Sequence, residues 1–83
     1  MLSVNDFNTF SLQKKLLTIF NEAKEIGYRK FDGFYIKLFK LEDFLVEVWY
    51  INEKNKIYKV EITSFDKALI DYSINIDISD IFK

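Results

Sequence analysis

The chain has 83 residues, with 12 basic and 13 acidic side chains and a net charge of −1. This length predicts a single domain over residues 1–83, because two separate cores would each be too small to fold alone. The sequence contains no cysteine and no histidine. Disulfides and thiolate zinc sites are therefore excluded, and the commonest general base and transition-metal ligand are missing.

The N-terminal part of the chain predicts a short turn followed by one helix. Ser3 and Asp6 form a weak capping box, which indicates a short turn over residues 3–8. A longer helix is predicted from Leu12 to Ile26, with Ser11 as its N-cap and Gly27 as a left-handed C′ residue. Apolar residues recur there at helical spacing and form one stripe that can pack on a sheet: Leu12, Leu16, Ile19, Phe20, Ala23 and Ile26.

Three strands are predicted next, over Phe34–Lys40, Phe44–Ile51 and Ile57–Thr63. A turn over residues 52–56 that uses Asn55 would give four cross-strand pairs: Ile51 with Ile57, Tyr50 with Tyr58, Trp49 with Lys59, and Val48 with Val60. In the preceding hairpin, a three-residue loop over residues 41–43 pairs Leu38 with Val46 and Ile36 with Val48. We prefer this loop because a two-residue loop would place Lys37 on the core face.

These registers divide the sheet into two faces. The core face holds Phe34, Ile36, Leu38, Phe44, Val46, Val48, Tyr50, Tyr58, Val60 and Ile62. The second face holds Tyr35, Lys37, Phe39, Leu45, Glu47, Trp49, Ile51, Ile57, Lys59, Glu61 and Thr63.

The last third of the chain predicts a short helix over residues 65–72, since residues 63–66 carry another capping signal. Residues 73–79 alternate strictly between apolar and polar, as an extended segment or a fourth strand does. The predicted fold is therefore α+β: an N-terminal helix packed on a three-stranded antiparallel meander, then a short helix and an extended C-terminal segment.

The segments V46-E47-V48-W49-Y50, N55-K56-I57 and I76-D77-I78-S79-D80-I81 carry a resemblance. They are similar to a pattern in a family of small, uncharacterised bacterial proteins of about 80 residues, common in Bacteroidota-type genomes, and the likeness covers residues 34–83. The resemblance supports the predicted fold. It implies no activity, because the family has none assigned.

No catalytic, cofactor or metal site is predicted. The acidic segment from Asp71 lacks the glycine and the terminal glutamate that a calcium loop requires. Glu47 and Glu61 are expected opposite each other on the second face, where Lys37 and Lys59 would bridge them, so a charge cluster is favoured over a carboxylate pair that performs catalysis.

The second face is the main functional lead, because large apolar side chains there alternate with charges. It could be covered by the chain's own helix or tail, form a homodimer or other protein interface, enclose a small apolar ligand, or bind single-stranded nucleic acid. The nucleic-acid alternative uses Tyr35, Phe39 and Trp49 for stacking, with Lys37, Lys54, Lys56 and Lys59 for phosphates. The slight negative charge makes nucleic acid an unlikely partner.

We expect a non-catalytic protein that acts through protein–protein contact, by self-association. The candidate interface residues are Tyr35, Phe39, Leu45, Trp49, Ile51, Ile57 and Lys59. No stretch approaches the roughly 18 apolar residues of a membrane helix. Residues 1–6 lack the basic and apolar regions of a signal peptide, so a cytoplasmic location is expected.

Overall fold

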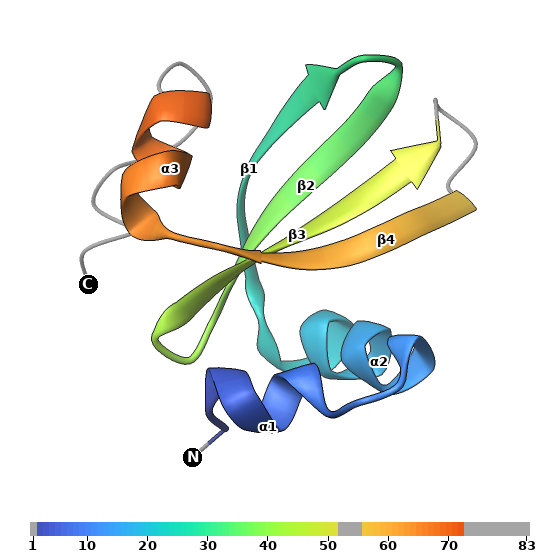
Figure 1. Ribbon diagram of the computed structural model, residues 1–83, viewed down its shortest axis with the longest axis vertical. Coiled ribbons are helices and arrows are strands. Elements are labelled where there is room, and N and C mark those ends of the chain that lie inside the picture. The colour runs from blue at the N-terminus through green and yellow to red at the C-terminus, as the bar shows by residue number, and fades with distance from the viewer. Residues whose placement is uncertain (1, 52–55, 73–83) are drawn as a thin grey trace.

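The computed structural model describes residues 2–51 and 56–72, which form three short helices and four strands (Figure 1). The elements in chain order are α1 (Val4–Asn8), α2 (Leu12–Glu22), β1 (Lys24–Phe31), β2 (Phe34–Leu41), β3 (Phe44–Ile51), β4 (Lys56–Thr63) and α3 (Phe65–Asp71). Within the described ranges, no helix is long and apolar enough to cross a membrane.

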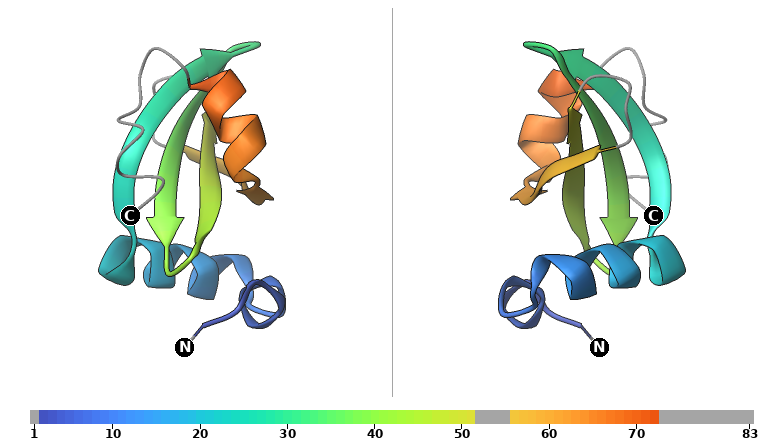
Figure 2. Two further views of the ribbon diagram at one scale, coloured as in Figure 1. Left: turned by 90° about the vertical axis from the view of Figure 1, so that its left-hand side faces the viewer. Right: turned by 90° about the vertical axis from the view of Figure 1, so that its right-hand side faces the viewer.

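The four strands form one antiparallel sheet in the order β1-β2-β3-β4. Helices α1 and α2 lie together at one end of the sheet, while α3 lies against it nearer the other end (Figures 1 and 2). The α+β class and the antiparallel meander are confirmed. The fourth strand comes from the N-terminal side of the meander, whereas the predicted C-terminal segment lies outside the described residues.

The predicted helix from Leu12 to Ile26 is too long, because α2 ends at Glu22 and Ala23 already has an extended backbone. The segment that follows pairs with β2 as β1, except at Ile26, where the register shifts between Glu25 and Gly27. This pairing supplies its backbone with hydrogen-bond partners, while Ile26 is buried at 7% exposure in the cluster that α3 covers. Gly27 lies in the strand beside a bulge and is not a left-handed C′ residue.

A two-residue turn joins β1 to β2. Asp32 and Gly33 have φ values of 50° and 84°, between the paired residues Phe31 and Phe34. Positive φ at both central positions is the type I′ turn, whose twist matches that of a hairpin and which favours Asp-Gly. The dipeptide D32-G33 therefore fixes the β1–β2 register.

The predicted register of the β2–β3 hairpin is wrong by one residue. The loop has two residues, so Leu38 faces Glu47 and Lys37 faces Val48. Lys37 does lie on the same side as Val48, yet its side chain remains 35% exposed because its ammonium reaches Glu25 at 3.8 Å. The shift moves Ile36 and Leu38 to the opposite face and brings Phe39 and Leu41 into the core that α2 covers.

The β3–β4 register is partly as predicted. Trp49 faces Lys59 and Val48 faces Val60, but the register shifts beyond Trp49, so Tyr50 faces Ile57. Tyr58 is the extra residue of this irregularity. The predicted turn at Asn55 lies outside the described residues.

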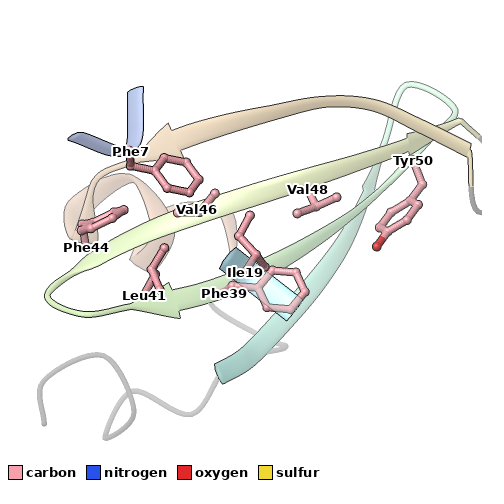
Figure 3. Close-up of a cluster of buried hydrophobic side chains, with 8 residues drawn as sticks. All are labelled: Phe7, Ile19, Phe39, Leu41, Phe44, Val46, Val48 and Tyr50. Atoms are coloured by element: carbon pink, nitrogen blue, oxygen red, sulfur yellow. The ribbon is translucent and has the colours of Figure 1, made fainter. Parts of the chain in front are cut away.

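Each face of the sheet carries its own core. On the face covered by α2, which we call the α2 face, Phe7 and Ile19 pack on strand residues, as Figure 3 shows. The buried members of this cluster are Phe7, Ile19, Phe39, Leu41, Phe44, Val46, Val48 and Tyr50. On the opposite face, which we call the α3 face, the buried cluster comprises Ile26, Leu38, Leu45, Ala68 and Tyr72.

Capping serines begin all three helices. The hydroxyl oxygens of Ser3, Ser11 and Ser64 accept hydrogen bonds from backbone N–H groups three residues later, at 3.1, 3.2 and 3.1 Å. The caps at Ser11 and Ser64 confirm the predicted starts of α2 and α3, whereas residues 4–8, predicted within a short turn, form α1. The cap at Ser64 fixes where α3 begins to cover the sheet.

Candidate interaction surface

Four aromatic side chains form a continuous row on the α3 face, one from each strand. Phe31 contacts Trp49 with ring centroids 6.2 Å apart, and Trp49 contacts Phe34 at 5.4 Å. Phe34 also contacts Tyr58 at 4.7 Å. We call Phe31, Phe34, Trp49 and Tyr58 the aromatic row.

The outer rings of the aromatic row are open to solvent. Phe31 is 55% exposed and Tyr58 is 53% exposed, whereas Trp49 between them is 8% exposed. Trp49 therefore serves as the packed base of the row, and Phe31 and Tyr58 form its accessible surface.

Local backbone features place these rings together. The type I′ turn puts Phe31 and Phe34 on adjacent strand ends as a directly opposed pair. On β4, the shift in register between Trp49 and Tyr50 leaves Tyr58 unpaired, so its ring reaches Phe34 on the α3 face. Without this shift, Tyr58 would lie on the α2 face opposite Tyr50, as the sequence predicted.

Two cations lie against the aromatic row. The Lys59 ammonium lies 4.2 Å from the centre of the Trp49 ring, and it also forms an ion pair with Glu61 at 2.6 Å. The Arg29 guanidinium lies 5.6 Å from the Trp49 ring and 5.5 Å from the Phe31 ring. Cation–π contacts of this kind orient both partners and shield the face of the indole.

A buried carboxylate lies beneath the row. Glu47 is fully buried, and its oxygens accept hydrogen bonds from three side chains. Arg29 donates from Nε at 3.4 Å and from Nη2 at 3.2 Å, Trp49 donates from Nε1 at 3.3 Å, and the Tyr72 hydroxyl donates at 2.5 Å. This network joins β1 and β3 to the end of α3, since Arg29 also lies 3.7 Å from Asp71.

The network explains how Glu47 and Glu61 can stand opposite each other, as predicted and observed. Arg29 compensates Glu47 and Lys59 compensates Glu61, while Lys37 pairs with Glu25. The predicted charge cluster is therefore present, but Arg29 takes the place that was predicted for Lys37.

Tyr72 is held in its protonated form. Burial raises the pKa of the Tyr72 hydroxyl far above its ordinary value, and the hydrogen bond to Glu47 and that carboxylate's charge raise it further. Tyr72 thus acts as a permanent donor that fixes the end of α3 to the sheet.

The seven candidate interface residues separate onto two faces. Leu45, Trp49, Ile51 and Lys59 lie on the α3 face, whereas Tyr35, Phe39 and Ile57 lie on the α2 face. Leu45 is fully buried beneath α3 and Phe39 is 6% exposed, so neither offers contact area to another molecule. Of the α3-face set, Ile51 and Lys59 are partly exposed beside the aromatic row.

Sequence reasoning missed Phe31, Phe34, Tyr58 and Arg29 as members of this surface. The missed element was β1, which carries Arg29 and Phe31. The signal that identifies it is D32-G33 between Y28-R29-K30-F31 and F34, a strong short-range indication of a hairpin.

In the described part of the chain, no group of three acidic side chains is placed to hold a metal ion. No protein-family model matches the chain, and no curated protein or solved structure is significantly similar to it. Membership of the bacterial family that the sequence resembles therefore stays a prediction.

Proposed function

We propose that this is a non-catalytic protein that acts through protein–protein contact, by self-association through the aromatic row. The observation that carries the proposal is the exposure of Phe31 and Tyr58 at 55% and 53% within a continuous set of four rings. Contiguous exposed apolar surface is uncommon in monomers and usually marks a contact site. A homodimer is the simplest form, because a two-fold contact uses one patch on both copies.

The composition of the surface also supports a protein partner. Aromatic residues and arginine are enriched at interface centres, and buried Trp, Tyr and Arg dominate binding energy. Phe31, Trp49 and Tyr58 are joined here with Arg29, whose side chain is 15% exposed. The rings already pack on one another, so little side-chain freedom remains to be lost when a partner binds.

The arrangement disfavours nucleic acid on this surface. A base would stack on the open face of an aromatic ring, but Lys59 lies over Trp49 and is itself paired with Glu61. The ring contacts of Phe31 and Phe34 with Trp49 are edge-to-face, with interplanar angles of 83° and 66°. Phe31, Phe34 and Trp49 therefore do not form a flat stacking platform, and Tyr58, inclined by 30° to Phe34, adds one tilted ring at the end of the row.

Catalysis has little support from the residues present. The sequence lacks histidine and cysteine, and the buried carboxylate Glu47 already accepts four hydrogen bonds. A general base needs access to a substrate proton. Glu47 has none, because its exposed fraction is 0%.

The test is sedimentation equilibrium of the wild type and of the double variant Phe31→Lys/Tyr58→Lys. We expect the wild type to self-associate at high micromolar concentration. The two lysines remove two exposed rings and add like charges across the two-fold axis, so the dissociation constant should rise at least about thirtyfold, corresponding to about 2 kcal/mol.

The matched control is Leu17→Lys/Ile70→Lys, which places two lysines at residues that are 58% and 78% exposed outside the aromatic row. This control should associate as the wild type does. A wild type that stays monomeric at high micromolar concentration, or a control that dissociates equally, would contradict the proposal.

A further inference from the structure

A second surface lies on the α2 face, near the β1–β2 turn. Tyr28 is paired with Lys37, and Lys30 is paired with Tyr35, so two tyrosines and two lysines alternate on neighbouring strands. We call Tyr28, Lys30, Tyr35 and Lys37 the tyrosine–lysine face. Figures 1 and 2 show α1 and α2 at the other end of the sheet, which leaves this end uncovered by them.

The two tyrosines form a stacked pair. Their ring centroids are 5.6 Å apart and their planes are inclined by 23°, in contrast to the edge-to-face contacts of Phe31 and Phe34 with Trp49. Tyr28 is 46% exposed. A near-parallel pair with one ring open to solvent can be extended by a further flat ring, as in proteins that stack bases on aromatic side chains.

The charge of the β1–β2 hairpin is opposite to that of the chain as a whole. Residues 24–41 contain five basic side chains and two acidic ones, although the net charge of the protein is −1. Two of the five, Lys30 and Lys37, lie on the tyrosine–lysine face, and the other three lie on the α3 face. Lys30 is exposed on the tyrosine–lysine face. Lys37 pairs with Glu25 at 3.8 Å, with side chains 35% and 48% exposed, and exposed pairs of this kind are weak enough to exchange for a phosphate.

We propose that the tyrosine–lysine face binds single-stranded nucleic acid. One base extends the stack of Tyr28 on Tyr35, and Lys30 and Lys37 contact the phosphates on either side of that nucleotide. An acidic polypeptide would satisfy the lysines but would leave the stacked pair without a role. The site is separate from the aromatic row, because the two surfaces lie on opposite faces of the sheet.

The experiment is fluorescence anisotropy of a labelled oligothymidine and of an abasic oligonucleotide of the same length, at low salt. We expect the oligothymidine to bind at least about tenfold more tightly, because stacking contributes to single-strand binding for each base on an aromatic ring. Trp49 fluorescence should stay constant, since Trp49 lies on the α3 face. Oligouridine is measured in parallel. Tighter binding of oligothymidine indicates DNA, and tighter binding of oligouridine indicates RNA.

Variants separate the two contributions. Tyr28→Ala should weaken oligothymidine binding about tenfold and leave abasic binding unchanged. Lys30→Gln and Lys37→Gln should each lower the slope of log affinity against log salt by about 0.7, the value for one phosphate contact on a single strand. The matched controls are Phe20→Ala and Lys67→Gln, an exposed aromatic residue and an exposed lysine outside both surfaces, which should leave both measurements unchanged.

Three results would overturn the proposal: no binding at low salt, equal affinity for the abasic strand, or competition by polyglutamate as effective as competition by oligothymidine. Loss of binding in Phe20→Ala would overturn the placement on this face. Self-association is measured separately by sedimentation of Tyr28→Ala, so failure of this site and failure of the aromatic row are distinguishable.

Discussion

Replacing Arg29 by methionine tests whether the buried carboxylate depends on its cation. The substitution keeps an apolar stem near the Phe31, Trp49 and Tyr72 rings but removes the charge and both hydrogen bonds to Glu47. At the observed 3.2 Å between Nη2 and the carboxylate oxygen, an effective dielectric constant of about 20 gives an attraction of about 5 kcal/mol.

Desolvation of the two charges offsets part of that attraction in the wild type, so the ion pair adds less to the free energy of unfolding than the attraction alone. Removing one partner is different, because Glu47 then stays fully buried without a cation, and such changes cost about 3–5 kcal/mol. Tyr72 and Trp49 still donate to the carboxylate, which favours the lower end, about 3 kcal/mol. A domain of 83 residues has a total stability of about 4–12 kcal/mol, so Arg29→Met should lose a large share of it.

The assay is urea unfolding followed by Trp49 fluorescence, with Arg29→Met, Glu47→Gln and the double variant as a cycle. The double variant removes both charges and keeps an acceptor for the Tyr72 hydroxyl, so it should regain about 2 kcal/mol relative to Arg29→Met. A loss below about 1 kcal/mol in Arg29→Met, or no recovery in the double variant, would refute this account of the network.

Two further predictions concern Tyr72 and Glu42. Because the pKa of Tyr72 is raised in the folded state, the contribution of Tyr72 to stability should be constant below the unfolded tyrosine pKa of about 10 and should fall by up to about 1.4 kcal/mol per pH unit above it. Tyr72→Phe should lessen this slope in urea unfolding between neutral and alkaline pH, although burial also raises the pKa of Tyr50 and leaves some dependence; an unchanged slope would contradict the assignment. Glu42 adopts a φ of 55° in the β2–β3 turn, so Glu42→Gly should raise the unfolding free energy by about 0.5–1 kcal/mol in the same assay, and a loss of stability would show that the turn carries no strain.

Much of the fold follows from local signals in the sequence. Ser11 and Ser64 identify the starts of α2 and α3 because a hydroxyl before an apolar run supplies an acceptor that the first helical turn needs. The Trp49–Lys59 and Val48–Val60 pairs also follow from pattern alone. These features depend on neighbours in the chain, which is why they could be predicted.

The remaining features depend on partners far away in sequence. Ile26 continues the apolar stripe of a helix, but it is buried in a strand because α3 covers that face. A three-residue β2–β3 loop would keep Lys37 off the core face, yet α2 covers only part of that face, so Lys37 stays partly exposed in the observed register. The role of Arg29 in the Glu47 network could not be predicted, because its partner Glu47 lies 18 residues away in the sequence.

The most direct test of the central claim, self-association through the aromatic row, is a dilution series of the isotope-labelled wild type by nuclear magnetic resonance. Amide and ring signals of Phe31, Phe34 and Tyr58 should change between low and high micromolar concentration. The amide and methyl signals of Leu12 and Leu17 on α2 should stay fixed. Signals that do not depend on concentration, or changes confined to α2, would contradict the claim.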